Sequence, residues 1–443
     1  MKAKRNPSLG AIFLTIVLDL LGFGLVIPFL AEEARDGFGT TAFVGTLLGA
    51  IYSLMQFLFV PIWGRLSDRV GRRPILVWSV FASGLTMLGL GLGLAYGHSV
   101  AWLFAARAFG GIATANLGTA SAYIADITAP KDRARGMGMV GMAFGIGFIL
   151  GPAMGGLLAK ITVNGKTGVV ACFAAAALSL VNFIWVWFGL PESLPPERRA
   201  RPSSRPGSAS PPESTGTSLP PLGPRRTLAP IDMGHARAVL ADAPLARAIL
   251  VNFLIVVAFT NLDQTFRYLN KDAFGMDQVD TGILLAFIGV VAAVVQGGLI
   301  RPLTRRYAEA SLVRVGTALQ CLAFAGIALS PSIGRSLLYA ASGLLALGNG
   351  ITQPTVSAFV SKRADATRQG AVLGTNQSFA ALARVIGPAF GGYVYGAISM
   401  RAPYIAGAIG MGVALLVAMT LRGDAPGTPA ASVAAGTADG SPE

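Results

Sequence analysis

Long apolar segments dominate this sequence of 443 residues. The first runs from Ala11 to Leu30 and contains a single charged residue, Asp19. About 20 apolar residues form a helix that crosses the hydrocarbon core of a bilayer. The chain is 53% hydrophobic and only 13% charged, which leaves too few polar residues to cover the surface of a soluble domain. We therefore expect an all-α polytopic membrane protein.

The apolar segments form two groups of six. The predicted spans lie near residues 11–30, 43–63, 75–96, 100–125, 137–159 and 169–190, and then near 246–268, 280–300, 312–330, 336–358, 369–395 and 402–421. We assign 1–190 and 246–422 to an N-terminal and a C-terminal six-helix half. Residues 191–245 are rich in Pro, Ser, Gly and Arg and predict a disordered cytoplasmic linker, and 423–443 predict a similar tail.

The distribution of Lys and Arg predicts the orientation. These residues are concentrated in the N-terminal tail, the even-numbered loops and the central segment, and such loops remain on the cytoplasmic side. We therefore expect a multi-pass protein of the cell (inner) membrane with both termini in the cytoplasm. The net charge of +14 is scattered through loops, which indicates lipid headgroups rather than nucleic acid as the anionic partner.

A polar turn at Trp63–Pro74 separates the second and third spans. Gly64 and Gly71 permit close backbone approach and positive φ, and the arginines mark the cytoplasmic face. The arginines alone are compatible with a loop that only fixes topology, but Asp68 between glycines is not explained in that way. The residues from Gly64 to Arg73 match every position of G-x-L-[SA]-D-R-x-G-R-[RK], and the turn thus resembles the signature of the major facilitator superfamily. The resemblance implies twelve helices in two halves and transport by alternating access.

A charge cluster is expected around this turn. Asp68, Arg69 and Arg72 lie in it, and Asp126 ends the fourth span at the same face. Oppositely charged side chains at one membrane face can hold the halves in one state. In the family, the signature aspartate meets the start of the eleventh helix, here near Gln369.

The fifth span carries glycines at a spacing of four residues. Gly147, Gly151 and Gly155 lie on one helix face, where they permit close packing, and Pro152 removes a backbone hydrogen bond. With Gly156, this run resembles the fifth-helix pattern of superfamily antiporters, which implies export in exchange for protons; ordinary helix packing explains the glycines equally well. The run Gly151–Gly156 recurs as Gly387–Gly392, an offset of 236 residues (387 − 151), which indicates duplicated halves.

Two charged residues inside the N-terminal spans suggest proton coupling. Asp19 lies in the first span and Arg107 in the fourth, and a charge at the centre of a span costs about 2.5–3.5 kcal/mol. Such residues have partners or functions. We expect the two to face each other across a cavity, where helix movement controls protonation of Asp19; a static ion pair is the alternative. Both fall where the family has its first-helix acid and fourth-helix arginine.

Polar residues on otherwise apolar spans are candidate substrate contacts, although such residues also bridge helices. Asp263 is the best single candidate, and Arg384 either attracts an anionic group or pairs within the C-terminal half. The full set is Tyr52, Gln56, Asn116, Asn261, Asp263, Gln264, Gln296, Gln320, Asn349, Gln353, Asn376, Gln377 and Arg384.

Four segments resemble the tetracycline-efflux family of drug:proton antiporters: Tyr52–Phe57, the signature turn, Ala122–Thr128 and the fifth-span run. That family's tetracycline exporters have acidic residues in the third and ninth helices, whereas 75–94 and 312–329 contain none. The resemblance implies proton-coupled efflux of an amphipathic drug or metabolite, driven by the proton gradient. A facilitator or proton symporter is the first alternative, and a non-transporting receptor that uses the linker is the second.

No grouping of a nucleophile, a base and an orienting residue suggests an enzyme. We expect no cofactor and no metal site, and a monomer that works with a small-molecule substrate, protons and membrane lipids.

Overall fold

The computed structural model describes residues 9–97, 99–128, 133–194, 199, 233–363 and 369–421; within these, the side chains of 133–138, 141, 144, 148, 233–235 and 369–371 are not described. The predicted tail at 423–443 and most of the predicted linker therefore lie outside the described residues. Helices make up nearly all of the described chain, and its β-type pairing is confined to an isolated bridge between Val163 and Lys166. The all-α prediction is confirmed.

Each of the predicted spans coincides with a helix or with a run of consecutive helices. In the N-terminal half these are α1 (Leu9–Gly24), α2 (Leu30–Glu32), the π-helix η1 (Glu33–Gly37), α3 (Ala42–Val70), α4 (Arg72–Tyr96), α5 (Val100–Ala113), α6 (Leu117–Ile127), α7 (Arg133–Ala159) and α8 (Val169–Gly189).

The C-terminal half continues the pattern. It contains α9 (Met233–Leu240), α10 (Ala243–Phe274), α11 (Gln278–Val294), the π-helix η4 (Val295–Leu299), α12 (Ile300–Arg306), α13 (Glu309–Ile333), α14 (Arg335–Arg363), α15 (Gln369–Ala397) and α16 (Ala402–Met419). By length and composition, eight helical segments in the described chain can cross a membrane.

The sequence prediction needs two corrections. The predicted linker reaches residue 245, but α9 and the start of α10 occupy 233–245, where Asp242 caps α10 by accepting a hydrogen bond from the Leu245 N–H (3.2 Å). The predicted turn at 63–74 is also shorter than expected. α3 continues through Gly64 to Val70 and α4 begins at Arg72, so the turn is reduced to Gly71.

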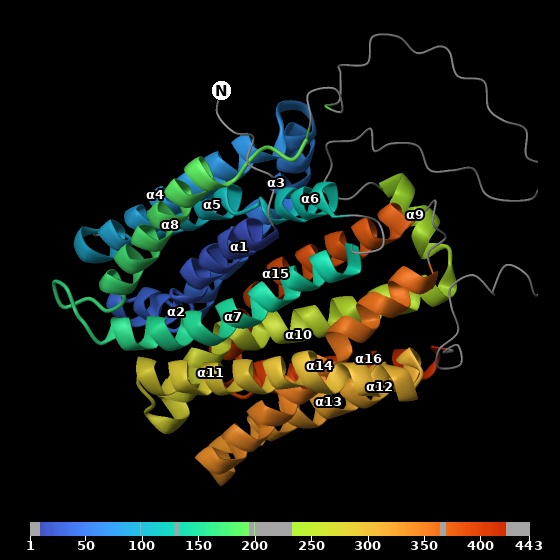
Figure 1. The fold of residues 1–443 in the computed structure, drawn as a ribbon. Helices are drawn as coiled ribbons and strands as arrows, with labels where there is room; N and C mark the ends of the chain where they lie inside the picture. Colours follow the sequence, from blue (N-terminus) through green and yellow to red (C-terminus); the bar gives the residue numbers. More distant parts are fainter. Residues whose placement is uncertain are drawn as a thin grey trace, which may run out of the picture.

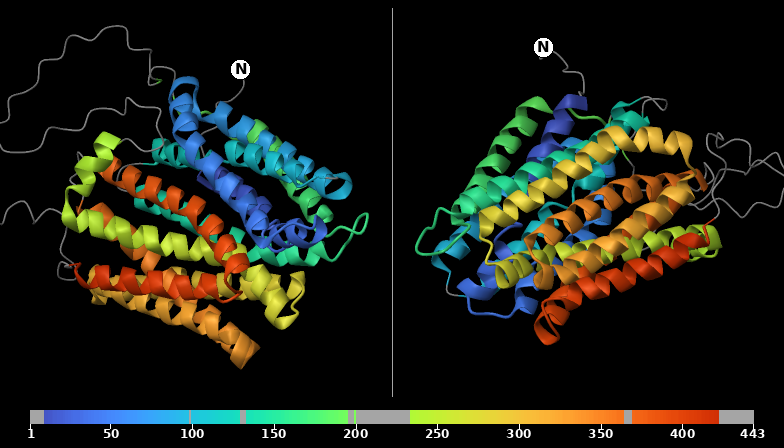
Figure 2. Two further views of the ribbon diagram at one scale, coloured as in Figure 1. Left: turned by 180° about the vertical axis from the view of Figure 1, so that it is seen from behind. Right: turned by 90° about the horizontal axis from the view of Figure 1, so that it is seen from below.

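The molecule consists of two helical bundles side by side (Figures 1 and 2). Across the boundary α3 packs against α15, and α7 packs against α11. We call the end with Gly71, α6 and α9 the signature end, and the end with α2 and η1 the opposite end. In the left view of Figure 2, α3 (blue) and α15 (orange-red) converge at the opposite end and diverge toward the signature end.

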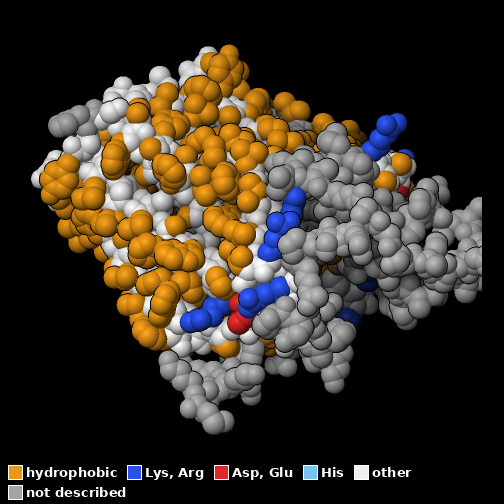
Figure 3. Space-filling model, turned by 90° about the horizontal axis from the view of Figure 1, so that it is seen from above, with side chains coloured by type: hydrophobic (Ala, Val, Ile, Leu, Met, Phe, Trp, Pro, Cys, Tyr) orange, Lys and Arg blue, Asp and Glu red, His pale blue; other side chains and the backbone are white. Residues whose placement is uncertain are grey.

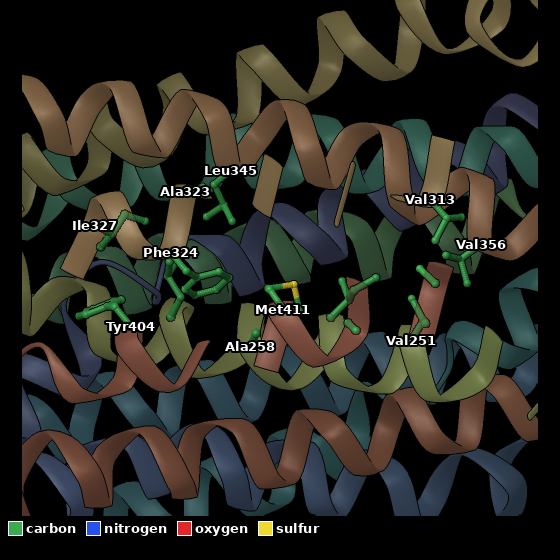
Figure 4. Packing of buried hydrophobic residues seen from close by; sticks show 14 of the residues in the cluster. Val251, Ala258, Val313, Ala323, Phe324, Ile327, Leu345, Val356, Tyr404 and Met411 are labelled. Atoms are coloured by element: carbon green, nitrogen blue, oxygen red, sulfur yellow. The ribbon is translucent and has the colours of Figure 1, made fainter. Parts of the chain in front are cut away.

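Each bundle has its own apolar core. The largest cluster joins α10, α13, α14 and α16 through side chains such as Val251, Phe324 and Met411 (Figure 4). Two other clusters lie within residues 11–190. The outer surface is also apolar: large hydrophobic side chains such as Trp78 and Phe188 are exposed, and hydrophobic residues cover most of the described face in Figure 3. Such a surface is suited to lipid.

Candidate functional site

The fourth span is interrupted near its centre, between α5 and α6. Residues 114–116 form a turn there, which leaves carbonyl oxygens without helical partners. Three side chains from two neighbouring helices, α3 and α4, donate to these oxygens: Trp63 to Ile112 O (2.7 Å), Ser79 to Ala113 O (2.6 Å) and Gln56 to Thr114 O (3.3 Å). Non-helical backbone inside a membrane persists only with such partners. Gln56 therefore supports this break in the fourth span.

Asp19 lies beside this break. It is placed one turn before the end of α1 at Gly24, and the side chain of Asn116, from the break itself, is its hydrogen-bond partner. The other carboxylate oxygen, Oδ1, is buried and has no hydrogen-bond partner. Within the described part of the chain, no ion pair reaches Asp19. The carboxyl group is thus held at the middle of the bundle with an unsatisfied oxygen.

Arg107 does not form an ion pair with Asp19, which was the alternative to the predicted facing arrangement. Its guanidinium lies over the ring of Tyr52 at 4.2 Å and near that of Phe23 at 5.9 Å, and its Nε donates to Leu48 O (3.4 Å). Phe23 is one helical turn beyond Asp19 and stacks on Tyr52 with 5.3 Å between the ring centroids. The arginine is therefore stabilised by the faces of two aromatic rings instead of by the carboxylate.

The C-terminal half contributes charges to the same region. Arg384 of α15 interacts electrostatically with Tyr52, and Asp263 of α10 with Arg107. Gln264 donates to Asp263 Oδ2 (2.7 Å) and packs against Gly49 of α3. Among the described residues, Arg384 has no hydrogen bond or ion pair. The middle of the bundle thus combines residues from both halves; we call Asp19, Tyr52, Arg107, Asp263 and Arg384 the central cluster.

The remaining polar candidates differ in how they are used. Asn376 accepts from Asn252 (3.0 Å), Asn261 donates to Pro403 O (2.7 Å) and Gln320 donates to Thr352 (3.1 Å), so these three side chains bridge helices within the C-terminal half. The side-chain oxygens of Asn261, Gln320 and Asn349 are buried without hydrogen-bond partners. Gln296, on η4, and Gln377 are exposed, and Gln353 is half-buried.

The predicted charge cluster forms at the signature end, within the N-terminal half. Arg72 pairs with Asp68 at 2.6 Å and with Asp126 at 3.2 Å. Arg69 is exposed, and a Cβ at Gly64 would meet open space, so the expected close approach there is wrong. The expected partner near Gln369 lies outside the described side chains.

Glu192 also belongs to this charge cluster, although sequence reasoning did not include it. Its carboxylate accepts from the backbone N–H groups of Arg72 (2.9 Å) and Arg73 (3.3 Å) at the start of α4. Gly71 has φ +111°, and a side chain there would overlap Glu192. The glycine is therefore required both for its backbone conformation and for the approach of this carboxylate. Glu192 follows the sixth span, and its place in the predicted linker concealed this role.

The glycine runs of α7 and α15 make equivalent contacts. Gly151 and Gly155 pack against Gly24, the end of α1, and Leu25, which follows it, and residues 387 and 391 pack in the same way against Thr260 and Asn261 of α10. Across the boundary, Gly156 meets Gly282, and Gly392 meets Thr46. Adding 236 to the residue numbers of the first half, or subtracting it from those of the second, turns each of these contacts into its counterpart. The repeat in the sequence is therefore a repeat of helix packing, with one glycine of each run at the boundary.

Ion pairs close the opposite end, and sequence reasoning missed them. Arg35 donates to both oxygens of Asp272 (2.7 and 2.8 Å), and Lys271 pairs with Asp36 at 2.6 Å. These four residues come from segments 35–39 (Arg-Asp-Gly-Phe-Gly) and 271–275 (Lys-Asp-Ala-Phe-Gly), again 236 residues apart. The last glycine has positive φ in both, +65° and +63°. We call these residues the opposite-end closure.

A buried ion pair adds to this closure. Arg267 donates to Glu32 at 2.6 Å, and both side chains are at most 7% exposed. Lys271 contacts the second oxygen of Glu32 at 2.7 Å, and Tyr268 donates to Ala31 O (2.8 Å). Arg267 also donates hydrogen bonds to Met276 O (2.6 Å) and Thr281 Oγ1 (3.0 Å), which complete its surroundings. Sequence reasoning gave no functional role to Arg35, Arg267 and Lys271.

The pKa of Asp36 reflects this environment. Partial burial opposes its ionisation, but hydrogen bonds from Arg35 and Lys271 outweigh that effect and lower the pKa below its ordinary value. Asp36 is therefore held in its charged form within the closure.

Two repeated helical bundles, with ionisable side chains inside spans at their boundary, define a secondary transporter of the membrane. The sequence comparisons give the family. The model of the Major Facilitator Superfamily matches residues 12–388 and again 335–439, and the chain belongs to this superfamily. Its members are transporters, so the chain is a multi-pass membrane transporter of small molecules and not an enzyme.

The chain is similar to two groups of curated proteins. Tetracycline resistance protein class C of Escherichia coli is 30% identical over 424 residues, which cover 95% of this chain and 97% of that protein. Major facilitator superfamily domain-containing protein 10 of Bos taurus is 29% identical over 438 residues, which cover 91% and 90%. The solved structure of the human organic anion transporter MFSD10 (TETRAN) has the same fold, with a TM-score of 0.66, 24% identity and coverage of 93% of this chain and 98% of that one.

Proposed function

We propose that this transporter exports an amphipathic drug or metabolite in exchange for protons, by alternating access. The observation that carries the proposal is the state of Asp19, a carboxyl group inside a span with a buried, unpartnered oxygen and no ion pair. A permanently charged carboxylate is costly in such a place, whereas a carboxyl that gains and loses a proton has a use there. Asp19 is therefore the group that carries the proton.

The aromatic pair Phe23 and Tyr52 connects this proton site to Arg107. Rotation of α1 relative to α5 moves Asp19 either toward the guanidinium, which favours the carboxylate, or away from it, which favours the protonated form. Tyr52 also interacts with Arg384 of the other half. A substrate that enters between the halves separates these groups, and its binding is thereby coupled to the charge on Asp19.

Alternating access follows from the position of the contacts. In the described residues the ion pairs between the halves lie at the opposite end, and the charge cluster of the signature end lies within one half. The structure therefore corresponds to a state that is closed at the opposite end. We propose that the signature end faces the cytoplasm, as the Lys and Arg distribution predicts, so that this state accepts substrate from the cell interior.

The tetracycline resistance relatives support a drug as the substrate, since their name records resistance to one. The third and ninth spans differ from those of the tetracycline exporters, because Ile75–Leu94 of α4 and Leu312–Leu329 of α13 contain no acidic residue. We propose that the substrate is an amphipathic compound other than tetracycline.

A second candidate is an organic anion as substrate. Arg384 faces the boundary between the halves with no ion pair among the described residues, and an anionic group of the substrate supplies the missing charge. The MFSD10 relative, whose solved structure is described as that of an organic anion transporter, supports this choice.

The test uses proteoliposomes that contain a pH-sensitive dye and carry an imposed pH gradient. Amphipathic cations, organic anions, tetracycline and neutral metabolites are added in turn. For an exporter, at least one compound discharges the gradient and is itself accumulated against its own gradient. Movement of a compound down its gradient without proton flux contradicts the proposal and identifies a facilitator. For an anionic substrate, Arg384→Gln raises the KM for anions by about tenfold, as expected for the loss of one charge-assisted contact, and leaves that for cations unchanged.

A further inference from the structure

A cavity lies at the signature end of the C-terminal half, away from the central cluster and the opposite-end closure. Its volume is about 710 Å³, and it is lined by the first turn of α10, by Arg314 of α13, by Arg363 of α14 and by the end of α16. Arg247 of α10 also lies in its wall, and none of the lining residues that the structure describes is acidic. The cavity is therefore strongly cationic.

The arginines are held in position by their neighbours. Arg314 donates to Ala418 O (3.2 Å) and Met419 O (3.3 Å), and Arg247 donates to Thr420 O (3.4 Å). These carbonyl oxygens lie in the last turn of α16 and at the residue that follows it, where they have no partners inside the helix. Each guanidinium has five N–H donors, so Arg247 and Arg314 retain donors for a ligand. The guanidinium of Arg363 lies over the Phe359 ring at 4.3 Å.

An apolar stripe begins at the mouth of the cavity. Met419, in the cavity wall, is 61% exposed, and Leu416 and Ile409 continue along the same face of α16 at 66% and 65%. In the right view of Figure 2, α16 (red) runs along the edge of the bundle. The cationic cavity therefore opens directly onto a surface that faces lipid.

We propose that this cavity binds the phosphate group of an anionic phospholipid, and that an acyl chain of the same lipid lies along the stripe from Met419 to Ile409. Guanidinium groups bind phosphate through paired, charge-assisted hydrogen bonds. Basic pockets between helices at a membrane surface are suited to anionic headgroups. The stripe distinguishes a lipid from free phosphate, because a soluble anion gains nothing from an apolar surface beside the cavity. The bound headgroup links the ends of α10, α13, α14 and α16.

The experiment measures binding of phosphatidylglycerol to the purified full chain in detergent by native mass spectrometry, with phosphatidylcholine as the reference lipid. Arg247→Gln and Arg363→Gln each weaken the tightest phosphatidylglycerol site by about fivefold, the effect of one cationic side chain at a membrane surface. Arg314 is left unchanged because it also holds the end of α16. Arg301→Gln and Arg305→Gln, exposed arginines of α12 at the same end, are the matched controls and leave binding unaltered.

Leu416→Gln tests the stripe. It weakens phosphatidylglycerol binding but has no effect on stabilisation of the chain by inorganic phosphate. Equal binding of phosphatidylglycerol and phosphatidylcholine, or equal losses in the cavity variants and the α12 controls, overturns the proposal. Stabilisation by inorganic phosphate that needs Arg247 and Arg363, without any preference for phosphatidylglycerol, assigns the cavity to a soluble anion and also overturns it.

Discussion

Arg35 and Asp272 face each other across the boundary between the halves, and the internal repeat exchanges their roles. The guanidinium donates to both carboxylate oxygens, at 2.7 and 2.8 Å. An offset of 236 residues converts this pair into Lys271 and Asp36, which are 2.6 Å apart. Duplication of one short segment therefore produced two ion pairs, because each copy provides the cation for the carboxylate of the other.

Asp272→Asn is expected to shift the transporter toward a state that is open at the opposite end. The pair is only partly exposed, with 17% of Arg35 and 30% of Asp272 accessible, so its loss costs about 1 kcal/mol, or roughly fivefold in the ratio of the two states. Spin labels at the exposed positions Thr162 and Ser399, one in each half, report the change by double electron–electron resonance. Lys160→Gln is the control, because its pair with Asp277 is long, at 3.8 Å, and more than half exposed. Equal distance distributions in Asp272→Asn and wild type would show that the pair does not hold this end closed.

Glu32→Gln is expected to open the same end more strongly than Asp272→Asn. The Glu32–Arg267 pair is buried, and removal of one partner from a buried pair costs roughly 3 kcal/mol because the remaining charge is uncompensated. The same pair of spin labels measures the shift. A smaller effect than that of Asp272→Asn contradicts the ranking of the two pairs by burial.

The closure also has a predicted pH dependence. The pKa of Asp36 is lowered in this state, so its contribution is fully present above the ordinary aspartate pKa of 3.8 and is lost as the pH falls through the lowered value. Acidification below about pH 4 therefore favours opening, and neutral to alkaline pH leaves this contribution unchanged. The label distances in wild type and in Asp36→Asn, recorded from pH 7 to pH 3, test the prediction. In the variant, the part of the pH response that belongs to Asp36 is absent.

Two glycines of α7 give opposite predictions for the same substitution. A Cβ at Gly151 would lie 2.7 Å from the Cα of Gly24, whereas a Cβ at Gly145 meets open space. Gly151→Ala therefore separates α1 from α7 and lowers the melting temperature of the purified protein. Gly145→Ala raises it slightly, by an amount corresponding to about 0.5–1 kcal/mol, because alanine is the better helix former. The two alanine variants are compared by thermal unfolding, and a similar fall in both would indicate that close packing of α1 and α7 is not the reason for Gly151.

The spans and the signature cluster were accessible to sequence reasoning because they depend on local pattern. Apolar segments of about 20 residues predict the helices, and the conspicuous charges of the turn predict that Arg72 meets Asp126. The opposite-end closure was not predicted, although Arg35-Asp36 and Lys271-Asp272 share the offset already visible in the glycine runs. Short charged segments of a loop carry no periodicity, and only the folded boundary shows that they meet.

Two further outcomes depended on geometry that the sequence does not contain. Asp19 and Arg107 lie at compatible depths within their spans, but the guanidinium of Arg107 lies over the ring of Tyr52 instead of beside the carboxylate. Glu192 caps α4 from the start of a segment whose composition resembles a linker. In both cases the partner of a charge was decided by side chains of other helices, which residue spacing does not specify.

The most direct test of the account compares wild type with Asp19→Asn in proteoliposomes, for a compound that discharges the pH gradient in wild type. Counterflow of the labelled compound is measured in parallel, since exchange of substrate alone needs no net proton movement. The account predicts that Asp19→Asn retains counterflow but no longer moves protons with the compound. Compound-dependent proton flux in Asp19→Asn equal to that of wild type would contradict the assignment of Asp19 as the proton carrier.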